Sequence, residues 1–145
     1  MIAKRIPARR KNVSSALFGA LLPMVAATLL TSGAARAADG SREAATAATH
    51  AGMAASAASL AGVRAHLHHT LNCLEGTGGI DFDPTAANPC AGLGSGAIFD
   101  TADASRKNEL VAAAGMARNT LALADLAKAQ AGAKQTADVL ARLAK

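Results

Sequence analysis

The sequence predicts an all-α fold, an antiparallel helical hairpin whose connecting loop is rich in glycine and proline and is closed by a disulfide. Residues 38–145 contain 31 alanines, and alanine has the highest helix propensity because it loses no side-chain entropy. Large apolar residues recur at helical spacing on both sides of the glycine-rich stretch. One of the two cysteines precedes that stretch and the other lies inside it, which suits a covalent closure.

Residues 1–37 have the pattern of a secretory signal peptide. A basic start is followed by an apolar segment over residues 16–30, which is too short to span a bilayer, and by a small-x-small cleavage pattern at 35–37. We therefore expect a periplasmic or secreted protein with no stable membrane anchor after cleavage. The Sec and twin-arginine routes both stay open, because the arginine pair at 9–10 lacks the hydrophobic residues expected after it.

The basicity of the chain belongs to this signal and not to the rest of the protein. The full chain has a net charge of +5, but six of its 15 lysines and arginines, and none of its ten acidic residues, lie in residues 1–37. Residues 38–145 therefore carry a net charge of −1. They contain no tryptophan or tyrosine, and only Phe82 and Phe99 remain as aromatic residues. Without a basic face or stacking platforms, we expect no nucleic-acid partner.

The first element expected is one long helix over residues 41–74. Ser41 is a candidate N-cap, and Gly76 can stop the helix as the residue after its C-cap. Larger apolar residues recur every seven positions and predict a row that faces one partner helix. These residues are Met53, Leu60, Leu67 and Leu74.

An ordered loop over residues 75–99 and a second helix over 101–144 should follow. We expect apolar side chains of the loop, such as Ile80 and Phe99, to fold back over the helix ends. The second helix should break near residue 132, at a glycine. Residues 38–145 would then form a single helical domain. Because two helices bury little, either the chain end folds back as a third helix, or the chain pairs as a homodimer or with a periplasmic partner.

Cys73 and Cys90 are 17 positions apart and are the only cysteines of the chain. In an exported protein they most simply form a disulfide, which would stabilise the fold by about 3 kcal/mol through loop closure. The alternative is a pair of reduced cysteines that join His66 and His69 in a four-ligand Cys₂His₂ metal site. The same sulfur atoms cannot serve both purposes.

The histidines are the candidate metal ligands. His66 and His69 share one helix stripe, and imidazole suits Cu, Ni and Zn. His68 faces another direction and would contribute through the loop or a second chain. On a continuous helix His50 would lie about 27 Å from His68, too far to share an ion. The alternative is structural, because histidines at a helix C-terminus can bond its last free carbonyls.

These four histidines and the alanine-rich composition resemble those of small exported bacterial helical proteins, some of which bind divalent metals. The chain differs from that group in having few histidines, all on the first expected helix. The resemblance is consistent with a small periplasmic, non-enzymatic protein that binds a divalent transition metal. The helix spacing, and not the resemblance, gives His66, His69 and His68 as the expected ligands. The alternative is a structural or protein-interaction hairpin without a ligand. We expect no enzyme, because no nucleophile and base are paired by any motif: Ser95, for example, lacks the Gly-x-Ser-x-Gly context.

Overall fold

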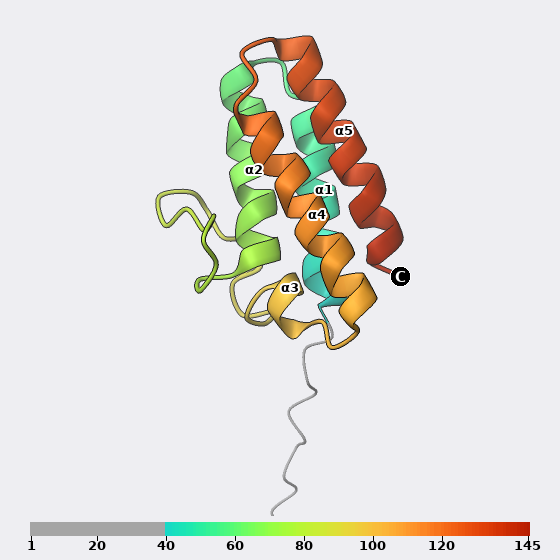
Figure 1. Cartoon of the computed structure of the whole chain (residues 1–145). Helices are drawn as coiled ribbons and strands as arrows, with labels where there is room; N and C mark the ends of the chain where they lie inside the picture. Colours follow the sequence, from blue (N-terminus) through green and yellow to red (C-terminus); the bar gives the residue numbers. More distant parts are fainter. Residues whose placement is uncertain (1–39) are drawn as a thin grey trace, which may run out of the picture. The chain divides into compact units, whose positions relative to one another are not determined.

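Four long helices and one short helix make up residues 40–145, the part of the chain that this computed structural model describes (Figure 1). No strand occurs within these residues, which confirms the predicted all-α class. None of their helices is long and apolar enough to cross a membrane. The predicted signal peptide lies outside the described residues. The helices are α1 (Ser41–Ala55), α2 (Leu60–Glu75), α3 (Ala97–Asp100), α4 (Ala104–Leu121) and α5 (Leu126–Leu143).

The prediction of one helix over residues 41–74 is wrong, because the chain turns between α1 and α2. Ser59 is the N-cap of α2, and its side-chain oxygen accepts a hydrogen bond from the backbone N–H of Gly62 at 3.2 Å. Such a cap satisfies a helix N-terminus locally and lets a new helix begin. The connection is only four residues long, 56–59, so α1 and α2 are antiparallel neighbours. The N-cap of α1 is Gly40 and not Ser41, whereas Gly76 does end α2 as expected.

The second predicted helix is also divided in two. It begins at α4, whose N-cap is Asp103, with the carboxylate accepting the N–H of Arg106 at 2.7 Å. A new helix starts after Asp125, whose carboxylate accepts the N–H of Lys128 at 2.8 Å. The break therefore lies at residues 122–125, where a carboxylate cap is available, and not at the predicted glycine.

Gly132 has a packing role inside α5. A Cβ atom at this position would lie 2.5 Å from the side-chain oxygen of Thr120 on α4. The missing side chain thus lets α5 approach α4 closely, and the helix continues through the glycine without a break.

The four long helices form a bundle in place of the single predicted hairpin. In Figure 1, α1 lies beside α2 and α5, and α4 lies beside α5 and α2. Long helices that follow each other along the chain are therefore also packed against each other. Two hairpins cover each other's apolar faces, which supplies the burial that one hairpin would lack.

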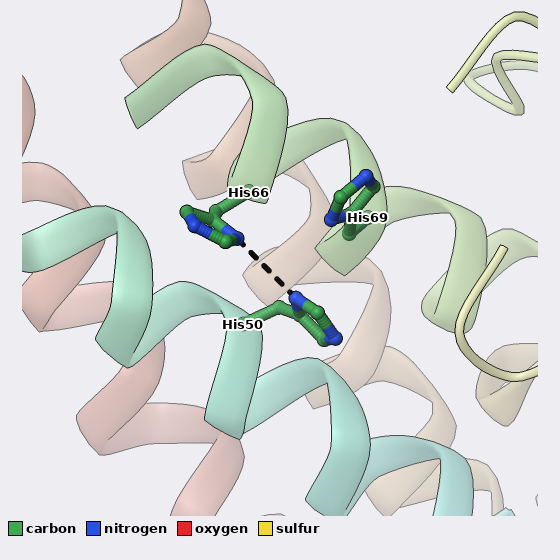
Figure 2. Close-up of side chains that lie close together, drawn as sticks. All are labelled: His50, His66 and His69. Carbon is green, nitrogen blue, oxygen red and sulfur yellow. Dashed lines mark hydrogen bonds between the residues drawn. The ribbon is translucent and has the colours of Figure 1, made fainter. Parts of the chain in front are cut away.

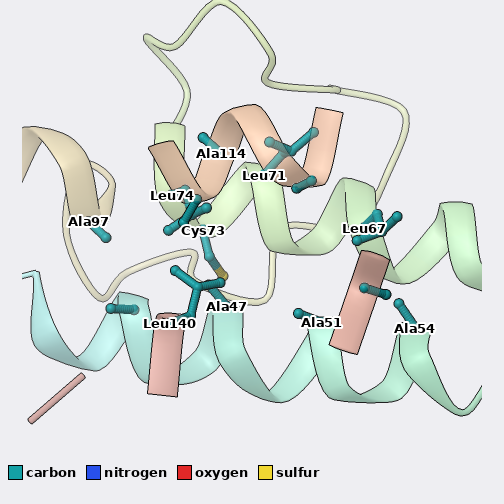
Figure 3. Close-up of a cluster of buried hydrophobic side chains, with 14 of the residues drawn as sticks. Ala47, Ala51, Ala54, Leu67, Leu71, Cys73, Leu74, Ala97, Ala114 and Leu140 are labelled. Atoms are coloured by element: carbon teal, nitrogen blue, oxygen red, sulfur yellow. The ribbon is translucent and has the colours of Figure 1, made fainter. Parts of the chain in front are cut away.

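The core combines a row of alanines on α1 with leucines from other helices (Figure 3). Small alanines allow close helix contact, and each fully buried leucine contributes about 1.5–3 kcal/mol. Met53 does not belong to this core, because 44% of its surface is exposed. The buried alanines of α1 are Ala44, Ala47, Ala51 and Ala54, and the large buried side chains include Leu67, Leu71, Leu74, Leu110 and Leu140.

The long connection between α2 and α3 is held at several points. The predicted disulfide between Cys73 and Cys90 is present, with Cα atoms 5.1 Å apart. The buried side chain of Asn72 donates to the carbonyl of Asp83 at 2.9 Å and accepts the N–H of the same residue at 2.8 Å. The connection is therefore ordered by one covalent bond and by the buried side-chain amide of Asn72, which pairs with backbone groups of the loop.

The apolar side chains at the two ends of this connection behave differently from the prediction. Leu93 and Ile98 pack against the core. Ile80 and Phe99 are instead 91% and 74% exposed. The satellite core expected over the helix ends is thus only partly formed.

Candidate metal centre

His50 of α1 meets His66 and His69 of α2 on one side of the bundle (Figure 2). The turn at residues 56–59 lies midway between positions 50 and 66, so the antiparallel helices place these two residues opposite each other. His69 lies one turn further along α2, on the same stripe as His66. The three side chains are each half-buried, so a small ion from solvent can reach them.

The rings approach one another closely enough to share an ion. The Nδ1 atoms of His50 and His66 are 3.4 Å apart. The ring centroids of His50 and His69 are 5.0 Å apart, and those of His66 and His69 are 5.6 Å apart, with nearly perpendicular planes. One candidate ligand nitrogen from each ring lies within 4.8 Å of the other two.

These distances suit a transition metal. Two nitrogens bound to one tetrahedral zinc at about 2.0–2.1 Å are about 3.4 Å from each other. The His50–His66 pair already has this separation between its Nδ1 atoms. A candidate ligand nitrogen of His69 lies within 4.8 Å of those of the other two rings.

The protonation state of the cluster favours a cation as the ligand. Burial, and then the charge of neighbouring His69 and His66, lower the pKa of His50. Burial, and then His66 and His68, lower the pKa of His69 in the same way. Because a lowered pKa keeps an imidazole neutral at pH 7, these rings have a free lone pair for a metal.

His69 also has a ring nitrogen without a partner. Its Nδ1 is shielded from solvent and makes no hydrogen bond within residues 40–145. A buried polar atom without a partner is costly in a folded protein. An ion held between the three rings is one way to satisfy the cluster's nitrogen atoms.

The structure changes the predicted ligand set in two ways. It joins His66 and His69 as expected but adds His50, which the sequence argument had excluded. It also separates His68, whose Nδ1 lies 3.3 Å from a carboxylate oxygen of Asp83 in the long loop. His68 thus faces the loop and lies outside the cluster of three histidines.

The disulfide excludes the alternative Cys₂His₂ site. Both cysteines are bonded to each other, and no free cysteine remains within the described part of the chain. Any metal centre at this position is therefore built from imidazole nitrogens and not from thiolates.

The exclusion of His50 came from the assumption of a continuous helix. On such a helix the 16 positions from His50 to His66 would separate the two side chains by about 24 Å. The signal that could have corrected this is Ser59, a good N-cap residue placed almost midway between the two histidines. A turn at that point predicts the pairing that the structure has.

Comparisons of the chain with protein-family models, with curated proteins and with solved structures each found no significant match.

Proposed function

We propose that this protein is a small exported, non-enzymatic protein that binds a divalent transition metal through His50, His66 and His69. The observation that carries the proposal is the convergence of three half-buried imidazoles from two helices, with candidate ligand nitrogens within 4.8 Å of one another. Two independent helix positions must be aligned to produce it, so it is more than a run of histidines in one segment.

The donor set points to Zn, Ni or Cu. Imidazole nitrogen binds these ions well, whereas Mg and Ca prefer carboxylate and carbonyl oxygen. The cluster holds three imidazole donors and no carboxylate. A bound divalent ion would therefore keep most of its charge and could attract an anion or a water molecule as a further ligand.

Export is supported by the disulfide, because disulfides are typical of proteins in oxidising compartments such as the periplasm, and Cys73–Cys90 fits that setting. The non-enzymatic role is supported by the sequence, in which no motif pairs a nucleophile with a base.

The test is isothermal titration of the purified, metal-free protein with Zn(II), Ni(II) and Cu(II). We expect binding of one ion per chain in the wild type. His50→Ala, His66→Ala and His69→Ala should each weaken it by about 10-fold or more, the loss seen even for groups that only orient a ligand. His68→Ala is the matched control, because it removes a histidine from the same helix that faces the loop.

The outcomes separate metal binding from a structural role. If the three variants lose binding while His68→Ala keeps it, and all four keep wild-type helicity by circular dichroism, the site is the metal centre. If the wild type binds none of the three ions, the histidines only stabilise the contact between α1 and α2. The hairpin would then act as a structural or interaction module.

A further inference from the structure

Met53 shares a surface of α1 with His50 and lies outside the core. It stands three residues after His50 on α1, and such positions are neighbours on a helix surface, with Cβ atoms about 5–6 Å apart. Its side chain is 44% exposed. The side chain is therefore accessible from solvent and is not held in the packed core.

The opposite directions of α1 and α2 bring the side chains of Met53 and the histidines closer together along the helix axes. Side chains on a helix lean toward its N-terminus. On α1, Met53 is nearer than His50 to the connection at 56–59, so its side chain leans back toward His50. On α2, which runs the opposite way, His66 and His69 lean toward the same connection and therefore toward Met53.

The side chain of Met53 is also able to adapt to an ion. It is unbranched, with three rotatable bonds and a polarisable thioether.

We propose that the thioether of Met53 is the fourth ligand of the site, and that it allows the site to bind monovalent Cu(I) tightly in addition to the divalent ions of the proposed function. This inference rests on the proposed metal site at His50, His66 and His69. Three imidazoles alone do not discriminate strongly among Zn, Ni and Cu, whereas a thioether is a soft ligand that selects Cu(I). Binding is by donation of lone pairs from three nitrogens and one sulfur, and no electron is transferred to or from the protein.

The experiment compares Met53→Leu with the wild type. Leucine keeps the size and apolar character of methionine but removes the sulfur. Cu(I) affinity is measured anaerobically, with ascorbate as the reductant, by competition with a chromophoric Cu(I) chelator. Zn(II) affinity of the same proteins is measured by isothermal titration. Met116→Leu is the matched control, because Met116 is on α4 and lines a pocket between α4 and α5.

We expect Met53→Leu to weaken Cu(I) binding by about 10-fold or more, the effect of losing a group that tunes a metal site. Zn(II) binding should be unchanged, and Met116→Leu should behave as the wild type for both ions. X-ray absorption of the copper-loaded wild type should show a Cu–S distance that disappears in Met53→Leu.

Other results would overturn the inference in distinguishable ways. If the wild type binds Zn(II) through the three histidines, and Met53→Leu leaves the Cu(I) affinity and the copper spectrum unchanged, the metal site stands but Met53 is not a ligand. If the wild type binds neither Zn(II) nor Cu(I), the proposed function fails together with this inference.

Discussion

The bundle contains two helix pairs, α1 with α2 and α4 with α5. Their connections are alike, but the residues at their contacts differ. Each pair has a four-residue connection that ends in a capping residue, Ser59 between α1 and α2 and Asp125 between α4 and α5. The contact between α4 and α5 includes the close approach of Gly132 to Thr120. The contact between α1 and α2 carries three half-buried imidazoles at its edge.

The difference between the two contacts shows which of them holds the candidate metal ligands. A contact made from glycine and threonine serves only to bring two helices together. The edge of the first pair holds groups whose burial lowers the pKa of His50 and His69, which is a cost to folding at low pH and not a gain. A disulfide and a buried amide at the C-terminal end of α2, about one turn after His69, add stability that offsets this cost.

The largest expected effect tests that compensation. Cys73→Ser together with Cys90→Ser removes the closure of the long loop, worth about 3 kcal/mol in the chain-entropy model. The Tm should fall by roughly 10 °C or more in a domain of this size. Thermal unfolding followed by circular dichroism, with the oxidised wild type beside it, measures the difference. An unchanged Tm would mean that the loop is held by its hydrogen bonds alone.

The next effect concerns the amide in the same region. Asn72→Ala leaves the N–H and carbonyl of Asp83 and the nearby carbonyl of Ala87 without their side-chain partner. The cost should be about 2 kcal/mol in the free energy of unfolding, measured by urea denaturation. Asn119→Ala, at an exposed position on α4, is the control and should change little. Equal effects of the two variants would contradict the role assigned to Asn72.

A smaller effect is expected in the second helix pair. Gly132→Ala forces a Cβ against Thr120 and should destabilise the protein by about 1–2 kcal/mol. Gly115→Ala on α4 is the matched control, because a Cβ there meets nothing within 4 Å. It should stabilise the helix by up to about 1 kcal/mol. Urea denaturation of both variants should therefore show shifts of opposite sign.

The smallest expected effect is the pH dependence of the first pair. The folded state lowers the pKa of His50 and His69, so the unfolded chain binds protons more readily. Stability should be fully present above about pH 6.5, the usual histidine pKa, and should fall as the pH drops below it. Urea denaturation at several pH values between 8 and 5 measures this for the metal-free protein.

His50→Gln should flatten that profile, because glutamine stays neutral across the range. Burial, followed by the nearby carboxylate of Asp81, raises the pKa of Glu75, so Glu75 acts in the opposite sense. It is present in both proteins, so it cancels in the comparison. A variant profile as steep as that of the wild type would show that the cluster does not titrate with folding.

Much of the fold could be predicted from local residue patterns. The alanine content and the apolar spacing predicted helices, and the predicted disulfide and the end of α2 at Gly76 are confirmed. The breaks were harder to predict, because Ser59 and Asp125 stand among strong helix formers. At these two positions helix propensity alone does not distinguish a continuous helix from a turn. The apolar burial that is gained when two hairpins pack together favours the turn.

The sequence by itself determined which chemical groups are available: four histidines, two cysteines and a surplus of alanines that favours helices. Only the tertiary structure decided which of them act together. It placed His50 of α1 against His66 and His69, placed His68 against Asp83 of the loop, and left Met53 exposed on α1. The physical reason is that helix periodicity relates residues a turn apart, whereas contacts between helices depend on where the chain reverses.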